Sequence, residues 1–356
     1  MIISKERGKD LNQKTDLLSL PFDKLLNFCL KRNLKKYRAI QIFERLHIKR
    51  NTDIDDFTEL SLDLRKKLKE EAKITEIEIL RVQKSKKDLT MKFLFRLEDG
   101  YTVESAVLKY KYGYTMCLST QVGCRMNCAF CLTGKDRFER NLSAGEILSQ
   151  IYKVEEKENI RIGRVVLMGM GEPLDNVSNV LDFIKIVSDH RGKNLGQRNI
   201  SVSTCGIVPA IIKTADEKIP FNLDISLHAS NDEIRNRLMS INKKYDIKSL
   251  IKAAKYFADT TGRRVTLVYL LIDGVNDTDE NARELVSLIK GQKFHLNLIR
   301  YNENKILDFK TSKNIDKFAE ILMKNGITVT TRRTLGDDID AACGLLRRSR
   351  NEEKII

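Results

Sequence analysis

The amino-acid sequence predicts an α/β protein with a parallel sheet curled into a partial (β/α)6 barrel, preceded by a small helical domain and a β-hairpin extension. Three observations support this prediction. The chain has 356 residues, which is enough for one large domain and a smaller one. Strand and helix patterns alternate six times after residue 112, as in a sheet with right-handed crossovers. Shorter helical patterns and one hairpin come before them.

Residues 20–72 predict a basic helical module. Pro21 suits a first helical position, and an apolar face follows it at Phe22, Leu25, Leu26, Cys29 and Leu30. Two further helical patterns lie at about 37–46 and 62–68. The outer faces bear Lys31, Arg32, Lys35, Lys36, Arg38, Arg45, Lys49, Arg50, Arg65, Lys66, Lys67 and Lys69. These charges favour a solvated surface and a platform for an RNA backbone about equally.

A β-hairpin is predicted next, with strands at 90–97 and 101–108 joined by Glu98-Asp99-Gly100. Glu104 lies in the second strand, where a carboxylate most often faces solvent, so the pattern alone gives it no role. We expect four segments along the chain. They are a helical domain of the RNA-binding type at 1–85, the hairpin extension at 86–112, the barrel at 113–345 and a basic tail at 346–356.

The barrel strands are expected at 115–119, 164–168, 199–203, 222–226, 264–272 and 294–299. Between them, Ser143 and Glu146 form a predicted capping box ahead of a helix, and amphipathic patterns lie at 180–187, 249–257 and 282–289. In such a barrel the chemistry belongs at the carboxyl ends of the strands.

Composition limits the possible partners and the compartment. The formal charge of +15 and the pI near 9.4 favour a polyanionic partner such as RNA, although a lysine-rich proteome would give the same excess. No apolar run approaches the ~20 residues of a membrane helix, so no membrane partner is expected. Seven cysteines at irregular spacing fit a reducing cytoplasm better than a disulfide scaffold.

Three of the cysteines, Cys124, Cys128 and Cys131, stand at a C-x3-C-x2-C spacing. Soft thiolate ligands select iron–sulfur clusters, zinc or copper(I). A structural zinc site needs four protein ligands, whereas a four-iron cluster on three cysteines leaves one iron open to a substrate. Ordinary buried thiols are the alternative, but three within eight residues are too clustered for packing alone.

Polar residues follow several of the predicted barrel strands. The stretch Met168 to Pro173 is rich in glycine and includes Gly171 and Glu172. Other strand ends supply Ser203, then Ser226-Leu227-His228, then Asn302 after Arg300-Tyr301. Hydroxyl, imidazole and amide groups converging on one barrel mouth could read a ribose, a carboxylate or an adenine.

Near the C-terminus, Gly336 to Gly344 contains three acids followed by small residues around Cys343. Together with Cys117 to Cys124, Met168 to Pro173 and Ser226-Leu227-His228, this stretch resembles the RlmN/Cfr family of radical S-adenosylmethionine (SAM) enzymes, over nearly the whole chain. The family methylates an adenine of large-subunit (23S) ribosomal RNA. Gly171 to Leu174 and the acids before Cys343 look like the branch that methylates C2. The other branch methylates C8 and confers antibiotic resistance.

The resemblance implies a role for each matching residue. Cys124, Cys128 and Cys131 are similar to the ligands of a [4Fe-4S] cluster whose fourth iron binds SAM. The matching SAM contacts are Gly171, Glu172, Ser203, Ser226, Leu227, His228 and Asn302. Cys343 resembles the methyl carrier, Glu104 the proton acceptor and Cys117 the thiol that closes a transient disulfide with Cys343.

The implied chemistry uses two SAM molecules per turnover. Cys343 takes a methyl group from one by thiolate displacement, and a 5′-deoxyadenosyl radical from the other abstracts a hydrogen from that methyl. The methylene radical adds to the adenine, Glu104 removes the ring proton, and Cys117 attacks the sulfur of Cys343 to release the RNA. The resemblance also implies an electron donor such as flavodoxin or ferredoxin, and an adenine of the transfer RNA anticodon loop as a further candidate substrate.

Leu132, Cys205 and Glu303 depart from the usual family pattern, which bears on substrate positioning. We expect Cys29 and Cys205 to be structural. Besides C8 methylation, two alternatives stay open at this point. One is another radical SAM enzyme, such as a glycyl-radical activator, and the other is a zinc-stabilised RNA-binding protein without catalysis.

Overall fold

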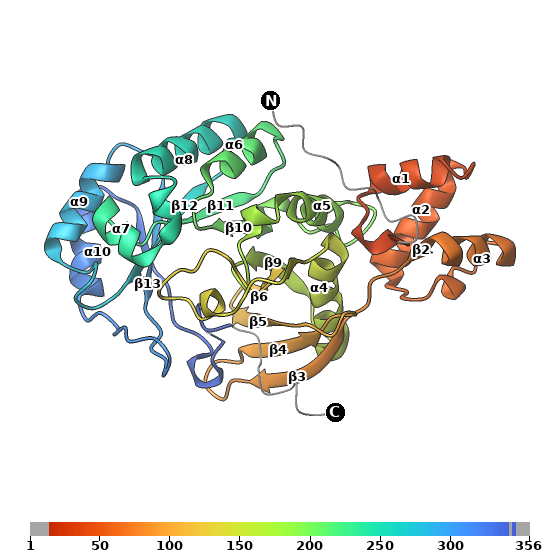
Figure 1. Ribbon diagram of the computed structural model, residues 1–356, viewed down its shortest axis with the longest axis horizontal. Helices are drawn as coiled ribbons and strands as arrows, with labels where there is room; N and C mark the ends of the chain where they lie inside the picture. The colour runs from red at the N-terminus through yellow and green to blue at the C-terminus, as the bar shows by residue number, and fades with distance from the viewer. Residues whose placement is uncertain (1–13, 342–343, 347–356) are drawn as a thin grey trace.

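The computed structural model describes residues 14–341 and 344–346. The molecule is elongated, with a helical module at one end and a mostly parallel sheet at the other (Figure 1). The module consists of α1 (Phe22–Leu30), α2 (Lys36–Glu44) and α3 (Leu62–Glu71), tied by the short parallel strands β1 (Thr15–Asp16) and β2 (Ala72–Lys73). The three predicted helices are confirmed, except that Pro21 lies at the N-cap of α1 and not inside the helix.

The main sheet has ten strands in the order β14-β13-β12-β11-β10-β9-β6-β5-β4-β3. Its parallel part is β6 (Gly113–Cys117), β9 (Ile162–Leu167), β10 (Ile200–Thr204), β11 (Asn222–Ser226), β12 (Val265–Leu271), β13 (His295–Arg300) and β14 (Val329–Thr331). The antiparallel part is β3 (Glu78–Lys84), β4 (Met91–Arg96) and β5 (Thr102–Tyr110). The six predicted parallel strands and the hairpin are confirmed within a few residues.

Two strands of the main sheet escaped the sequence prediction, for physical reasons. The edge strand β14 has three residues, two of them exposed threonines, so it shows no apolar alternation. The other edge strand, β3, is half-buried and interrupted by a bulge between Ile79 and Arg81. Because β3 pairs with β4, the sheet reaches back across the boundary predicted at residue 85.

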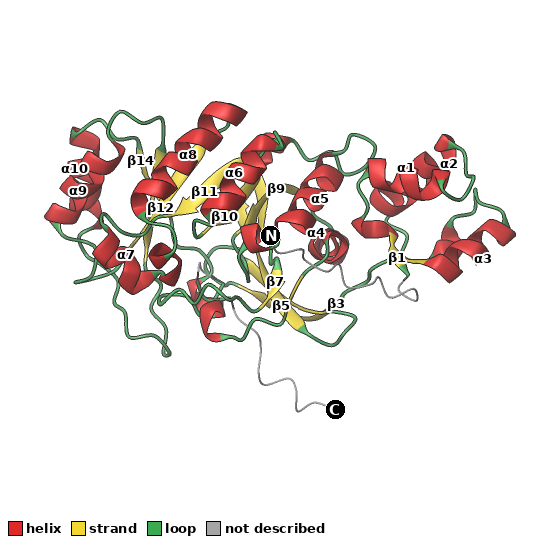
Figure 2. Ribbon diagram, turned by 45° about the horizontal axis from the view of Figure 1, so that its top comes forward, coloured by secondary structure: helices red, strands yellow, loops and turns green. Residues whose placement is uncertain are grey.

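The crossover helices lie along the outer side of the sheet (Figure 2). They are α4 (Ala144–Glu158), α5 (Val177–Ser188), α6 (Val208–Asp216), α8 (Ile247–Thr261), α9 (Asp279–Ile289) and α10 (Ile315–Lys324). The short helix α7 (Asp232–Leu238) lies instead at the carboxyl ends of the barrel strands. The predicted capping box of α4 is confirmed, since Ser143 accepts from the Glu146 N–H and Glu146 accepts from the Ser143 N–H. Among the helices of the described residues, none has the length and hydropathy needed to cross a bilayer.

The helical module shares its hydrophobic core with the barrel, so the two parts pack as one body. His47, which follows α2, is 2% exposed, and its Nδ1 lies 3.2 Å from the hydroxyl of Tyr152 on α4. Burial lowers the pKa of His47 to about 3. Nearby, Arg50 forms an ion pair with the buried carboxylate of Glu155. The joint therefore combines apolar packing with buried polar contacts.

Candidate active site

The three clustered cysteines lie in the loop after the short strand β7 (Gln121–Val122) and line one cavity at the carboxyl ends of the barrel strands. The loop is anchored to the end of α7, because the Ala129 N–H donates to the Leu238 carbonyl at 2.9 Å. Asn127, between the first two cysteines, adopts a left-handed backbone with φ of 49°. This reversal bends the loop so that its thiols share a single cavity.

The chemistry of the three thiols fits an iron–sulfur cluster. In the part of the chain that the structure describes, no three His, Cys, Asp or Glu side chains converge as the ligands of one metal ion do. In an iron–sulfur cubane each thiolate binds its own iron, so the sulfurs stand farther apart than on one zinc. Burial raises the pKa of all three thiols, that of Cys124 to about 12, and metal binding to thiolates would release their protons.

Gly171 and Glu172 form the next wall of the cavity, at the end of β9. Gly171 has φ of +102°, and a Cβ there would stand 2.6 Å from the Gln121 side chain, so the turn requires glycine. Glu172 is 4% exposed, and its carboxylate accepts from the N–H groups of Cys205 at 2.8 Å and Leu174 at 3.0 Å. Burial raises the pKa of Glu172, and these hydrogen bonds oppose the rise.

Ser203, Ser226 and His228 complete the cavity from the ends of β10 and β11. His228 has a left-handed backbone with φ of 56°, an uncommon conformation that accompanies functional strain in many proteins. Its Nδ1 accepts from the Leu270 N–H at 3.0 Å, which places the proton of the neutral ring on Nε2. Burial, and then the charge of Arg235, lower the pKa of His228 to about 3, so the ring is a neutral donor.

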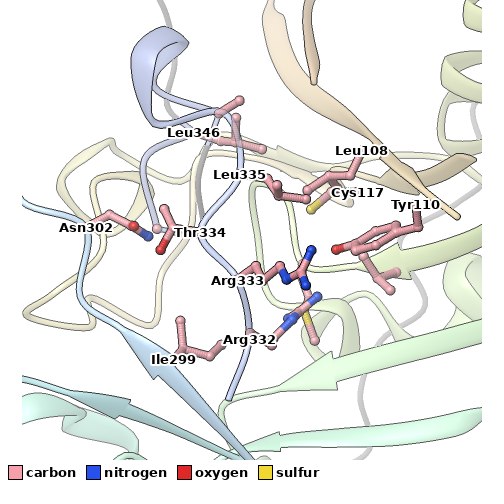
Figure 3. A pocket seen from close by; sticks show the side chains of 14 residues that line it. Leu108, Tyr110, Cys117, Ile299, Asn302, Arg332, Arg333, Thr334, Leu335 and Leu346 are labelled. Atoms are coloured by element: carbon pink, nitrogen blue, oxygen red, sulfur yellow. The ribbon is translucent and has the colours of Figure 1, made fainter. Parts of the chain in front are cut away.

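Two predicted SAM contacts lie outside the lining of this cavity. Leu227 is fully buried, and its backbone N–H donates to the Val268 carbonyl at 3.0 Å. Asn302 lines a second cavity together with Cys117 (Figure 3). The two cavities adjoin, because Met168, Ile299 and Gly344 line both.

In the second cavity Cys117 lies beside Leu108 and Tyr110, across from Asn302 and Thr334 (Figure 3). Cys117 ends β6 and is 8% exposed. The predicted methyl carrier Cys343 lies outside the described residues, but its described neighbours Ala341 and Gly344 line this cavity. The six described cysteines form no disulfide with one another, so the predicted pair of Cys117 and Cys343 stays a prediction.

The acid-rich segment before Cys343 docks on the lysine-rich turn between β3 and β4. Lys87 Nζ lies 3.0 Å from Asp337 Oδ2, and the Lys86 N–H donates to Asp338 Oδ2 at 3.0 Å. The Gly336 N–H donates to Asp88 Oδ2 at 2.8 Å. The cluster of acids in a basic protein thus has a local partner, and the docked segment covers the face of the sheet that includes Cys117.

Glu104 does not face solvent, contrary to the expectation from the strand pattern. It is 3% exposed on β5, and Lys92 Nζ on β4 lies 3.4 Å from its Oε1. Ala106 on β5 pairs with Cys117 on β6, so Glu104, two residues along, has its side chain on the same face as Cys117. The alternation of side chains therefore brings the predicted proton acceptor and the predicted resolving thiol to one surface.

Three further residues belong to the site without having been predicted from the sequence. Gln121 accepts from the Glu172 N–H at 2.8 Å, Lys92 pairs with Glu104, and Arg235 lies fully buried beneath the cofactor cavity. Only Arg235 had a detectable signal, since it precedes the apolar Leu238 and Met239 at helical spacing. The roles of Gln121 and Lys92 depend on contacts between segments that are distant in sequence, so the sequence pattern does not reveal them.

The three departures from the family pattern have different surroundings. The Leu132 N–H donates to the Gly344 carbonyl at 2.9 Å, which links the cysteine loop to the C-terminal segment. Cys205 lines the cofactor cavity and its N–H holds Glu172, so its role is more than the structural one expected. Glu303 is turned toward Thr311 and Lys310. Cys29 is buried in α1, as expected for a structural thiol.

Comparisons with known proteins agree with this geometry. Residues 118–286 match the Radical SAM superfamily, and residues 15–74 match the Ribosomal RNA large subunit methyltransferase N-terminal domain. The probable dual-specificity RNA methyltransferase RlmN of Clostridium novyi is 46% identical over 336 residues, which span 94% of this chain and 98% of that protein. The chain belongs to the RlmN family.

Other RlmN relatives and a solved structure extend the same result. The protein of that name from Staphylococcus aureus strain JH9 is 46% identical over 94% of this chain and 93% of its own length. The crystal structure of a radical SAM methyltransferase from Sphaerobacter thermophilus superposes with a TM-score of 0.86 at 38% identity, covering 94% of this chain and 99% of that one. The predicted family and fold class are confirmed, and membership implies an iron–sulfur cluster and SAM as cofactors.

Proposed function

We propose that this member of the RlmN family methylates C2 of an adenine in 23S ribosomal RNA through a methyl group held on Cys343. One observation supports it most strongly. The cavity of the three clustered cysteines adjoins the cavity of Cys117 and Asn302, and Gly344, next to Cys343 in sequence, lines both. The cavity of the clustered cysteines and the cavity of Cys117 meet at one wall, as the proposed division of labour requires.

Within this proposal, Cys124, Cys128 and Cys131 hold the [4Fe-4S] cluster and leave one iron to bind SAM. When bound, the cluster and two SAM molecules supply the methyl group, the reducing electron and the 5′-deoxyadenosyl radical. Gly171, Glu172, Ser203, Ser226, His228 and Asn302, with the backbone at Leu227, orient SAM. Glu172 and the neutral Nε2–H of His228 offer an acceptor and a donor in the lining of the cavity.

The residues of the second cavity act on the RNA. Cys343 presents the methyl carbon to the adenine, and the carboxylate of Glu104 accepts the ring proton once the new carbon–carbon bond has formed. The thiolate of Cys117 then attacks the sulfur of Cys343, and the bond from that sulfur to carbon breaks with its electron pair passing to the carbon. That carbon takes a proton to become the methyl group, the unpaired electron of the adduct returns to the redox centre, and a disulfide is left. Lys92 beside Glu104 supports the ionised form that a base requires.

RNA is the proposed partner because the relatives bear the name of RNA methyltransferases and the helical module matches a ribosomal RNA methyltransferase N-terminal domain. The target adenine must leave its stack to reach a barrel mouth. An adenine of the transfer RNA anticodon loop is proposed as a second substrate, flavodoxin or ferredoxin as electron donor, and the cytoplasm as the compartment.

Nucleoside mass spectrometry of 23S ribosomal and transfer RNA tests the proposal. RNA from a strain lacking this gene, with and without the gene restored, is digested and compared. We expect 2-methyladenosine only where the gene is present. A gain of 8-methyladenosine instead would assign the enzyme to the C8 branch, and no change in either nucleoside would overturn the proposal.

A further inference from the structure

Arg235 on α7 has no exposed surface, and its guanidinium is held by oxygens at the ends of two barrel strands. Its Nη2 donates to the carbonyls of Cys205 at 2.7 Å and Ser226 at 3.1 Å. Its Nε donates to the Leu227 carbonyl at 3.1 Å, and its Nη1 to the Asn242 amide oxygen at 2.9 Å. Every contact is with a neutral group.

A fully buried cation without a carboxylate neighbour is costly, because the neutral oxygens replace only part of its hydration. Within the described chain, no Asp or Glu forms an ion pair with Arg235. The nearest acid, Asp232, is reached through Asn242, whose amide donates to Asp232 Oδ1 at 2.9 Å. The fold therefore keeps a positive charge largely uncompensated by the protein at this point.

That charge lies directly behind residues that line the cofactor cavity. Cys205 and Ser226, whose carbonyls bind the guanidinium, both line the cavity together with Cys128. The cysteine loop is also fastened to the helix of Arg235, because the N–H of Ala129, next to Cys128, donates to the Leu238 carbonyl of α7 at 2.9 Å. The buried cation thus lies behind two lining residues of the cavity, on the helix that anchors a proposed cluster ligand's loop.

We propose that Arg235 is a positioning residue that supplies a fixed positive charge to the iron–sulfur cluster and thereby raises its reduction potential. One-electron reduction adds a negative charge to a cluster already bound by anionic thiolates. A cation buried at low dielectric stabilises that added charge, whereas the same cation in water would be screened. The inference depends on the cluster that family membership implies, and not on the identity of the methylated carbon.

The test is a redox titration of the reconstituted cluster with dithionite, followed by electron paramagnetic resonance without RNA. We expect Arg235→Gln to disfavour the reduced cluster at least tenfold, which for a one-electron couple is a shift of 59 mV to more negative potential. The matched control is Arg237→Gln, since Arg237 is exposed on the same helix. Its loss should change the ratio of reduced to oxidised cluster less than twofold. An unchanged potential in Arg235→Gln would overturn the proposal.

Two more variants separate the electrostatic role from a role in fastening the strand ends. Arg235→Lys keeps the charge and loses the fork of donors, so it should lower the melting temperature while the potential stays near that of the wild type. A shift in Arg235→Lys as large as in Arg235→Gln would assign the residue to fastening alone.

Asp232→Asn leaves Arg235 in place and removes its nearest acid, so the potential should move to more positive values. If Arg235→Gln cannot retain a cluster, this variant decides the matter. A positive shift supports the proposal, and no shift or a negative one overturns it. Because RNA plays no part in these titrations, their failure is distinct from a failure of the proposed methylation.

Discussion

Lys92 Nζ on β4 lies 3.4 Å from Glu104 Oε1 on β5, and both side chains are more than nine-tenths buried. A carboxylate at this depth would favour its protonated form without a cation nearby. Lys92 also lies 3.5 Å from the Asp340 carbonyl, three residues before Cys343 in sequence. One lysine therefore contacts both the proposed base and the segment that leads to the proposed methyl carrier.

Lys92→Met should stall turnover at the step that needs Glu104. Without the cation the buried carboxyl loses its ionised form, so ring-proton removal should slow by about 10²-fold, the lower end of the range for general base catalysis. Glu104→Gln should stall at the same step. Single-turnover reactions on a denaturing gel should show an RNA–protein adduct accumulating in both variants.

Lys84→Met is the control for these variants, since Lys84 is exposed on the neighbouring strand β3 and pairs with Glu158. It should turn over like the wild type. Normal turnover by Lys92→Met would remove the lysine from the mechanism, and normal turnover by Glu104→Gln would return Glu104 to a structural role.

The exposed lysines of the helical module should bind RNA phosphates. Lys31, Lys35, Lys66 and Lys67 are exposed and form no ion pair with an acid in the described chain, whereas Arg32 and Arg45 pair with Glu71 and Glu59. Replacing these four lysines by Ser should reduce the salt dependence of RNA binding by roughly one unit of slope per lost phosphate contact. Filter binding at several salt concentrations measures this slope.

Point substitutions suit this test better than removal of residues 1–85, because the module shares its core with the barrel. Three exposed lysines of α8, Lys248, Lys252 and Lys255, serve as the control, since α8 lies on the barrel, well away from α1, α2 and α3 (Figure 1). If the variant lacking the four module lysines and the variant lacking the three α8 lysines show equal salt slopes, the module is an ordinary solvated surface.

The buried His47 should make the joint between module and barrel sensitive to acid. Its pKa is about 3 in the folded protein against 6.5 as the ordinary value, so the folded state binds fewer protons between these limits. Stability is then fully present above pH 6.5 and is lost as the pH falls toward 3, by about 2 kcal/mol at pH 5.

His47→Gln, which stays neutral, should be less stable than the wild type by about 1 kcal/mol at pH 7.5, where the contact with Tyr152 is weakened. At pH 5 the order should reverse. Urea denaturation at both pH values measures the two differences, with His190→Gln as the control because the His190 side chain is 81% exposed. Parallel stability curves for His47→Gln and the wild type would show that His47 does not titrate in this way.

The sequence allowed the barrel to be predicted because its signals are local. The capping box of Ser143 and Glu146 and the apolar run of β12 are each complete within a few residues. Buried charges were not predictable in this way. Glu104 looked like an exposed strand residue, and its burial follows from β5 lying between β4 and β6 in the middle of a sheet. Sequence periodicity gives the face of a side chain, but not which elements cover that face.

The site residues likewise fall into those that a local sequence pattern reveals and those that depend on the arrangement of distant segments. Cys124, Cys128 and Cys131 are close in sequence, so their spacing alone indicated a metal centre. Cys117 and Asn302 are far apart in sequence, and their place in one cavity results from the sheet order and from residues 332–341 and 344–346, which contribute to its lining. The partner of Glu104 required the register of β4 and β5, in which Leu94 lies opposite Glu104 and Lys92 is its diagonal neighbour.

The last prediction separates the roles of the two proposed active thiols. If Cys343 holds the methyl group and Cys117 only resolves the intermediate, their replacement should block different steps. Cys343→Ala should accept no methyl group and form no covalent RNA adduct. Cys117→Ala should still be methylated at Cys343 and join it to the adenine, but it lacks the thiol needed for exchange. The RNA should therefore stay attached to the protein.

A denaturing gel with labelled RNA reads this difference directly, and mass spectrometry of the protein reports methylation of Cys343. We expect a slowly migrating adduct for Cys117→Ala and none for Cys343→Ala or the double variant. Cys29→Ala is the matched control, because Cys29 is a buried thiol of α1 in the helical module and its loss should leave turnover intact. Because Cys117 is only 8% exposed at the end of β6, alanine there leaves a small void and the fold should persist. Unmethylated Cys343 and adduct-free gels in both single variants, with the cluster retained, would contradict the assignment of both thiols.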